Sequence, residues 1–357
     1  MLTAPERKDF AVTRFGVVMS SLEGDPREAW GVLNPGGVRS PDGALHLFPR
    51  LIAEGNFSRI GHVRVRFEGE TPVGVERLGM ALEPREPYEV GPSGGGVEDA
   101  RVVYVPAIKC YLMTYTAFVP YEPRVAIAVS TDLQVWRRLG LVHFEATSDG
   151  PDLNLSSNKD AAFFPEVIRD PSGVPSLGML HRPTTRVHFR SCGSSVTAPP
   201  SGEEMLERIW ISYVPIDAVL ADIARLTRVR RHERVMASVE PWEVQKIGAG
   251  APPVRLPYGW VLPYHAVSVL NGQIRYCMGI AILDLDRPSH VLYRTPHPIL
   301  EPQAEYERNG LVNNVVFPTA SDLRPDRLLD VYYGAADHVI AAARITLPNQ
   351  LPTREFE

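Results

Sequence analysis

Polar side chains recur at the ends of apolar, strand-like segments, and these residues have the clearest capacity for chemistry in this sequence. A purely structural channel can be lined by small or apolar residues, so this polar set indicates a polar ligand such as a sugar or a phosphate. Carboxylates beside cationic groups are the pattern expected for glycoside cleavage or for transfer to phosphate. The set comprises Asn34, Arg50, Glu98, Asp99, Arg101, Lys159, Asp160, His181, Arg182, His265 and Asp337.

Several of these residues also have an ordinary structural interpretation. Lys159 and Asp160 by themselves read as a surface turn, and His181 and His265 read as histidines satisfied inside a core. The glycines at 94–96 precede a strand-like segment and not a helix, so neither a P-loop nor a dinucleotide fingerprint fits. They form either a flexible loop or a loop that lets a substrate approach Asp99 closely, and the spacing does not separate the two.

Other catalytic motifs do not occur in the sequence. No pair of histidines has metal-ligand spacing and no HExxH motif is present, so we expect no metal site. No GxSxG elbow occurs, and Cys110, Cys192 and Cys277 lack a partner motif. Carboxylate acid–base chemistry is the class that remains.

The elements that would position these residues form an internal repeat. Five times, a small or acidic residue or a proline leads into an apolar strand, and a turn and a second strand follow. The repeats start at 34, 98, 164, 252 and 314, and the added strands at 125–129, 209–213 and 276–283 give about four strands per unit. Repeats of four short strands are typical of propeller blades, so we predict an all-β, five-bladed β-propeller. A large β-sandwich with coincidental hairpins is the alternative.

The third interval is longer than the others and predicts an insertion at about 186–234. Apolar residues spaced by three and four predict one amphipathic helix over 215–229. The basic cluster from Arg225 to Arg234 reads as a solvated helix face and not as a patch that follows phosphates. We expect residues 1–357 to form a single propeller domain that carries this one helical insertion.

Composition excludes several classes of protein. The 33 prolines and 28 glycines among 357 residues argue against helical bundles and solenoids, and 44% hydrophobic residues argue against disorder. The net charge of −5 shows no basic footprint for nucleic acid. Three scattered cysteines suit a reducing compartment, and no apolar run reaches the length of a membrane span. We therefore expect a cytoplasmic protein with no nucleic-acid or membrane partner.

Ten ordered motifs between about residues 30 and 345 resemble the β-mannoside phosphorylases of glycoside hydrolase family 130. They are NPGGV, GGGVEDARVV, MTYTAF, STDLQVWRRLG, KDAAFFPE, LHRP, KIGAGAPPV, YHAV, NNVVFP and YYGAADHVIAAA. The resemblance implies a five-bladed β-propeller, which agrees with the repeat count. It also implies inverting cleavage of a β-mannosidic bond by inorganic phosphate, a co-substrate, with α-mannose 1-phosphate as product and no other cofactor.

The resemblance assigns roles to individual residues. Asp99 matches the family's acid, which protonates the glycosidic oxygen through a hydroxyl of the mannosyl ring. The implied phosphate-binding residues are Arg124, Lys159, His265 and, as a weaker candidate, Arg138. The implied substrate-binding residues are Asn34, Arg50, Glu98, Arg101, His181, Arg182 and Asp337. The implied partners are a mannose-containing oligosaccharide and phosphate, and a homo-oligomer is compatible with the resemblance.

The sequence departs from the family pattern at two motifs, and two other functions stay open. EDAR, with Ala100, replaces the usual EDPR, and YHAV replaces the usual YHG. A β-1,2-mannosidase is the first alternative, and it needs a carboxylate such as Glu166 or Glu243 to activate water. A sugar-binding propeller without catalysis is the second alternative. The linkage of the substrate, β-1,4 or β-1,2, is not determined by these motifs.

Overall fold

Antiparallel strands make up most of the chain in this computed structural model, which describes residues 9–91, 94–119, 122–147, 151–184, 207–270 and 272–353. Within these ranges the α-helices are two short segments, α1 (Ile216–Ala221) and α2 (Glu305–Arg308). The all-β class is therefore confirmed. No helix in the described part of the chain is long and apolar enough to cross a membrane.

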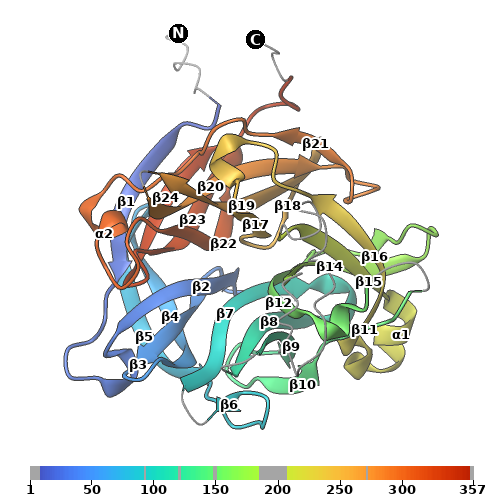
Figure 1. The fold of residues 1–357 in the computed structure, drawn as a ribbon, viewed down its shortest axis with the longest axis horizontal. Helices are drawn as coiled ribbons and strands as arrows, with labels where there is room; N and C mark the ends of the chain where they lie inside the picture. Colours follow the sequence, from blue (N-terminus) through green and yellow to red (C-terminus); the bar gives the residue numbers. More distant parts are fainter. Residues whose placement is uncertain are drawn as a thin grey trace, which may run out of the picture.

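The strands form five blades around a ring, so the five-bladed propeller is confirmed (Figure 1). Blade 1 contains β2 (Gly31–Arg39), β3 (Leu45–Ala53), β4 (Phe57–Glu68) and β5 (Thr71–Leu82). Blade 2 contains β7 (Gly94–Val105), β8 (Cys110–Val119), β9 (Glu122–Ser130) and β10 (Arg137–Leu141), with the short β6 (Val90–Gly91) beside β7. A short parallel pairing of β4 with β7 joins these two blades into one sheet.

The other three blades complete the ring. Blade 3 contains β12 (Ser157–Phe163), β14 (Pro175–Thr184), β15 (Ile209–Pro215) and β16 (Arg228–Met236), with the short β11 (His143–Phe144) and β13 (Ile168–Arg169). Blade 4 contains β17 (Lys246–Ala249), β18 (Val254–Leu256), β19 (Gly259–Leu270), β20 (Gln273–Leu283) and β21 (Val291–Arg294). Blade 5 contains β22 (Val316–Arg324), β23 (Leu328–Ala335), β24 (Val339–Thr346) and β1 (Val12–Met19).

The two ends of the chain close the ring, because β1 pairs with β24 in the last blade (Figure 1). Five buried hydrophobic clusters of the described residues each span two neighbouring blades. Phe163 of blade 3 and Ile127 of blade 2 share one cluster, and Trp260 of blade 4 and Phe164 of blade 3 share another. Apolar burial at these junctions fixes how far each inner strand stands from the ring axis.

The structure corrects three local predictions. In blade 3 the inner strand is β12, which ends just before the predicted start at 164, and in blade 4 the strand β17 precedes the predicted start at 252. The helix predicted over 215–229 is broken, because Asp222 is extended and its side chain accepts a hydrogen bond from the amide of Ala224. The basic cluster lies mainly on β16 and not on a helix face.

The predicted insertion belongs partly to the blade itself. Residues 209–236 supply the two outer strands of blade 3 with α1 between them (Figure 1). Side chains of a strand normally alternate between its two faces, but Arg231 in β16 has a left-handed φ of 56° and interrupts this alternation. The two-residue period that identifies a strand is therefore not visible in this part of the sequence. Residues 185–206, and with them Cys192, lie outside the described residues.

Candidate active site

All five blades contribute side chains to one cavity of about 190 Å³. Its lining contains four cationic residues, Arg50, Lys159, Arg182 and Lys246, against three carboxylates, Asp99, Asp160 and Asp337. A lining with more cations than carboxylates suits an anionic ligand. The other lining residues are Asn34, His265, Tyr276, Val312, Val315 and Phe317.

The same bulge places a polar side chain in the cavity from each of the first three blades. Asn34, Asp99 and Asp160 have φ values of 44°, 51° and 53°, and the strand register shifts at each of them. Asn and Asp are the non-glycine residues that adopt this left-handed conformation most readily. A β-bulge re-aims the side chain that it carries. The recurring N-P, D-A and D-A pairs are therefore the sequence signature of this bulge.

Asp99 lies on a wall formed by blades 1 and 2. Asn34 Nδ2 donates a 2.9 Å hydrogen bond to Asp99 Oδ1, and Arg50 Nη1 lies 3.5 Å from the same oxygen. Arg50 also donates to Glu98 Oε1 at 2.6 Å. Burial opposes the charge of Arg50, but the carboxylates of Glu98, Asp99 and Asp337 outweigh it and raise the pKa of the guanidinium. This wall, the acid wall, consists of Asn34, Arg50, Glu98 and Asp99.

Asp337 faces the acid wall from blade 5. Burial, reinforced by the negative charges of Asp99 and Glu98, raises the pKa of Asp337 to about 6, although Arg50 and Lys159 oppose the shift. A carboxyl with a raised pKa is easier to protonate in the folded protein than in the unfolded chain. Asp337 therefore changes charge close to neutral pH, inside the cavity.

The Asp337→Asn variant is expected to gain stability relative to the wild type as pH rises from about 4 to about 6. Over this range the folded wild type binds more protons than the unfolded chain, so ionisation of Asp337 lowers the wild-type free energy of unfolding. Asparagine cannot ionise and avoids this loss. Urea unfolding of both proteins across the range measures the difference, and a difference that does not change with pH would contradict the assignment.

Asp160 organises the other charged part of the lining, which meets the acid wall where Lys159 Nζ lies 3.9 Å from Glu98 Oε2. The Asp160 carboxylate accepts a 2.6 Å hydrogen bond from Arg182 Nε, and Arg101 Nη2 lies 3.4 Å away. Despite burial, the charges of Arg182 and Arg101 hold the pKa of Asp160 well below its usual range. Lys159 lies 4.8 Å from the centre of the Phe118 ring. We call Lys159, Asp160, Arg182, Lys246 and His265 the cation wall.

His265 is the neutral member of the cation wall. Burial lowers its pKa to about 3; the Asp160 carboxylate opposes this shift, and the positive charges of Arg182, Arg101 and Lys246 add to it. Its Nε2 lies 3.5 Å from Asp160 Oδ2, and its ring packs 4.4 Å from the Phe317 ring, measured between centroids. His265 therefore contributes hydrogen-bonding capacity to the cavity and no net charge.

Gly248 provides the space in which Asp160 and His265 meet. A Cβ atom at this position would lie 2.3 Å from Asp160 Oδ2 and 2.4 Å from His265 Cε1. We expect Gly248→Ala to displace both side chains, to lower kcat/KM by about 10-fold or more, and to cost about 1–3 kcal/mol of stability. Steady-state kinetics with a thermal melt measure both effects.

The matched control is Gly74→Ala, because there the nearest atom to an added Cβ is the mobile end of Arg66, 2.9 Å away. This variant should keep wild-type kinetics. Equal kinetics for Gly248→Ala and Gly74→Ala would show that the close approach at Gly248 does not hold the site.

Seven of the residues assigned by resemblance line the cavity, and five do not. Glu98 and Arg101 lie directly behind the lining, where they pair with Arg50 and Asp160. Arg124 donates to the carbonyl of Asn154 and to Glu122, and Arg138 binds the buried carboxylate of Glu89 at 2.8 Å. The structure therefore does not bring Arg124 or Arg138 to the cavity. The residues in the lining are Asn34, Arg50, Asp99, Lys159, His265, Arg182 and Asp337.

His181, the fifth residue outside the lining, is fully buried within blade 3 and hydrogen-bonds to Asn158 and Ser212. Conversely, the assigned set did not contain Lys246, Tyr276, Val312, Val315 and Phe317, which do line the cavity. Lys246 opens the KIGAGAPPV motif and Phe317 lies in NNVVFP, so the motifs carried a signal for both. Tyr276 lies in no such motif, and only the pairing of β20 with β19 brings it beside His265.

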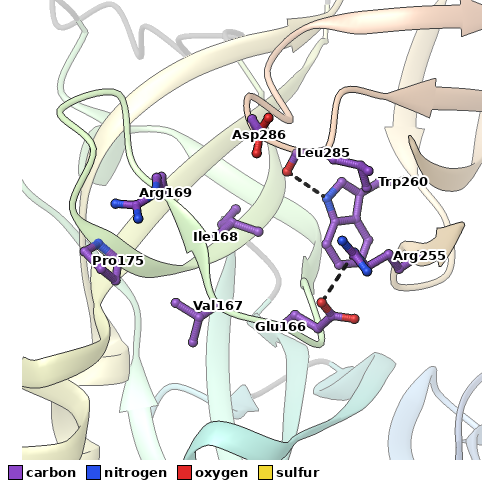
Figure 2. Close-up of a pocket in the computed structure, with 9 residues that line it drawn as sticks. All are labelled: Glu166, Val167, Ile168, Arg169, Pro175, Arg255, Trp260, Leu285 and Asp286. Carbon is purple, nitrogen blue, oxygen red and sulfur yellow. Dashed lines mark hydrogen bonds and ion pairs between the residues drawn. The ribbon is translucent and has the colours of Figure 1, made fainter. Parts of the chain in front are cut away.

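A second cavity, of about 240 Å³, lies between blades 3 and 4 (Figure 2). Two of its four charged residues are paired with each other, since Arg255 Nε lies 3.5 Å from Glu166 Oε2. The indole of Trp260, which also lines it, is buried and donates to the carbonyl of Leu285 at 3.4 Å. Among the residues that the structure describes, only blades 3 and 4 line this cavity, whereas carboxylates and cations from all five blades converge on the first cavity, which is therefore the candidate active site.

The protein is a five-bladed propeller whose blades converge on one cavity lined by carboxylates and cations. Residues 6–351 match the model of glycoside hydrolase family 130, described as beta-1,4-mannooligosaccharide phosphorylase. The chain belongs to this family.

Curated relatives are similar to most of the chain. It is 32% identical over 252 residues to a 1,2-beta-oligomannan phosphorylase of Thermoanaerobacter sp. (strain X514), a match covering 70% of this chain and 67% of the relative. It is 30% identical over 262 residues to a beta-1,2-mannobiose phosphorylase of Listeria innocua, covering 73% and 61%. The matched region thus spans only about two thirds of each relative's own length.

Solved structures of the family have the same fold. The beta-1,2-mannobiose phosphorylase from Listeria innocua, in complex with beta-1,2-mannobiose, superposes with a TM-score of 0.68 at 22% identity and covers 94% of this chain and 97% of that one. A structure from work on family members that are glycoside hydrolases targeting beta-1,2 mannosidic linkages in Candida mannan superposes with a TM-score of 0.72 at 20% identity, covering 99% and 98%. At these identities the likeness establishes the fold alone.

Proposed function

We propose that the protein is an inverting β-mannoside phosphorylase that uses inorganic phosphate to release α-mannose 1-phosphate. The observation that carries the proposal is the arrangement of one cavity, in which Asp99 stands on the acid wall and Lys159, Arg182 and Lys246 stand on the cation wall. The names of the curated relatives support both the phosphorylase reaction and a β-mannosidic substrate.

The reaction exchanges one bond for another at the anomeric carbon. A phosphate oxygen forms a bond to C1 while the bond from C1 to the leaving oxygen breaks, and that oxygen takes a proton that originates from Asp99. The family resemblance routes this proton through a hydroxyl of the mannosyl ring. Phosphate is already a nucleophile, so the enzyme needs cationic positioning and no second carboxylate to act as base.

The acid wall would hold the mannosyl ring, and the cation wall would hold phosphate. Asn34, Arg50 and Asp337 surround Asp99 and offer donors and acceptors for sugar hydroxyls. Three fixed cations and a neutral imidazole on the other wall offer hydrogen bonds to the phosphate oxygens. An attack from the wall opposite the acid accounts for inversion at C1.

A hydrolase is the competing function, and the two carboxylates proposed as its base do not line the cavity. Glu243 is fully buried and accepts a 2.7 Å hydrogen bond from the Tyr264 hydroxyl. Glu166 lies at the second cavity, paired with Arg255 (Figure 2). Asp160 lines the active-site cavity, but Arg182 occupies its carboxylate. These placements favour phosphorolysis over hydrolysis and leave a sugar-binding protein without catalysis as the other alternative.

We also propose that residues 1–357 act as one propeller domain in the cytoplasm, with no nucleic-acid or membrane partner, and that a homo-oligomer is compatible with its function. Cys110 and Cys277 are buried free thiols, which suits a reducing compartment where phosphate is abundant. The matches to β-1,2-mannoside phosphorylases cover more of the chain than the match to the β-1,4 enzyme, so β-1,2-linked substrates are the first to test.

The test is incubation of the protein with β-1,2-mannobiose or β-1,4-mannobiose, each with and without phosphate. Phosphate-dependent release of mannose 1-phosphate is the expected result. Free mannose formed at the same rate without phosphate would establish the hydrolase. Tight binding of either mannobiose without cleavage would establish the sugar-binding protein.

A further inference from the structure

A buried chain of hydrogen bonds crosses blade 3 from its inner strand to its outer edge. It runs from Asn158 on β12 to His181 on β14, Ser212 on β15 and His232 on β16. The three contacts measure 3.0, 2.8 and 2.7 Å, and His232 Nε2 then lies 2.9 Å from the backbone carbonyl oxygen of Glu145. We call these four side chains the blade 3 chain.

The carbonyl at the outer end fixes the direction of every bond in the blade 3 chain. A carbonyl oxygen only accepts, so His232 Nε2 carries a proton. Burial lowers the pKa of His232, so the ring is neutral and its Nδ1 accepts from the Ser212 hydroxyl. The Ser212 oxygen is then free to accept from His181 Nε2. His181 Nδ1 consequently accepts from the amide nitrogen of Asn158, the closer of the two amide atoms at 3.0 Å against 3.3 Å.

The inner end of the blade 3 chain lies directly behind the cation wall. Asn158 is opposite Pro183, and Lys159 is opposite Arg182, in the pairing of β12 with β14. Successive side chains of a strand point to opposite faces, so Asn158 and His181 share one face while Lys159 and Arg182 share the other. The blade 3 chain thus links β12 to β14 on the face away from the cavity. Lys159 and Arg182, the residues that follow Asn158 and His181, line the cavity on the other face.

The blade 3 chain adds a second side-chain link between β12 and β14, beside the hydrogen bond from Arg182 to Asp160. Asn158, His181 and Ser212 are each at most 1% exposed, and Phe144 covers the chain, its ring 4.8 Å from that of His181. The register of β12 with β14 shifts between Lys159 and Ala162, which interrupts the ladder beside the cavity. Hydrogen bonds between buried polar side chains are strong in this low-dielectric setting and rigidify the structure around them.

We propose that the blade 3 chain positions the cation wall, with His181 and Ser212 as positioning residues that hold Lys159 and Arg182 in place for the phosphate. This inference rests on the proposed function, which assigns phosphate to that wall. The residues proposed to hold the mannosyl ring come from blades 1, 2 and 5. Loss of the blade 3 chain should therefore weaken phosphate binding and leave mannoside binding nearly unchanged.

The first measurement is on the unmodified protein. The ¹⁵N chemical shifts of its histidine rings should report His181 and His232 as neutral, with the proton on Nε2 in both. A proton on Nδ1 of His181, or a charged His181 at neutral pH, overturns the proposal. This measurement needs no turnover and no variant.

The second measurement is the kinetics of Ser212→Ala, which removes the central link. We expect the KM for phosphate to rise by about 10-fold to 100-fold while the KM for the mannoside stays within about twofold. Ser176→Ala is the matched control, since Ser176 is a buried serine of the same blade that bonds only locally, to the carbonyl of Val174. It should leave both KM values unchanged.

His232→Ala tests the same link from the half-buried outer end if Ser212→Ala does not fold. A folded variant with a lowered melting temperature and an unchanged phosphate KM would show that the chain serves stability alone and would overturn the proposal. Correct histidine tautomers in a wild type that needs no phosphate would instead overturn the proposed function.

Discussion

Replacement of Asp99 by asparagine is expected to lower kcat for β-mannoside phosphorolysis by about 10²-fold to 10⁴-fold, the usual contribution of a general acid. The amide oxygen of the variant can still accept from Asn34 Nδ2, which now lies 2.9 Å from Asp99 Oδ1. The shape of the acid wall is therefore kept while the transferable proton is lost. The KM for phosphate should change little, because the cation wall is intact.

The control is Glu166→Gln, which removes an exposed carboxylate at the second cavity and should leave kcat unchanged. A leaving group that needs no protonation provides a further check, because an activated aryl β-mannoside should recover much of the rate of Asp99→Asn. If the variant turns over mannobiose as fast as the wild type, Asp99 is not the acid, and Asp337, which faces it across the cavity, becomes the candidate.

The architecture could be predicted from local marks in the sequence, and the presence of Asp99 in the cavity could be predicted from the family resemblance. Each blade repeats a turn-linked hairpin, and each of the first three inner strands carries a bulge whose left-handed residue is Asn or Asp, the types that adopt this conformation most readily after glycine. That bulge appears in the sequence as NP, DA and DA at Asn34, Asp99 and Asp160. The repeat was therefore enough for the architecture, and the resemblance was enough for seven of the residues that line the cavity, whereas the bulge is identified only in the structure.

The remaining site residues depend on contacts between distant strands. Tyr276 reaches the cavity only through the long pairing of β19 with β20, and nothing in its neighbourhood in the sequence marks it. Arg138 looks like a free cation in the sequence, yet the fold gives it the buried partner Glu89. His181 likewise looks like a ligand until its neighbours Asn158 and Ser212 are known. The residues with which Arg138 and His181 pair are set by the tertiary structure, so the charge or type of these side chains alone could not show whether they bind a ligand.

The Asp160→Asn variant is expected to lose about 3–5 kcal/mol of stability at neutral pH, the usual cost of breaking a buried ion pair by removing one partner. Asp160 is 3% exposed and lies 2.6 Å from Arg182 and 3.4 Å from Arg101, both also buried. Asparagine keeps the shape and one acceptor oxygen but leaves Arg101 with only backbone carbonyls as partners. Urea unfolding at pH 7 measures the loss.

The pH dependence separates this charge effect from a packing effect. The pKa of Asp160 is lowered on folding, so its stabilisation is complete above the unfolded-state pKa of about 4 and is lost as pH falls toward the lower folded-state value. The gap between wild type and variant should therefore narrow below about pH 4. Asp25→Asn, which breaks the exposed pair with Arg27, should cost less than about 1 kcal/mol. A similar small loss for Asp160→Asn would mean that Arg101 and Arg182 do not depend on it, and that the cation wall is held by the strands alone.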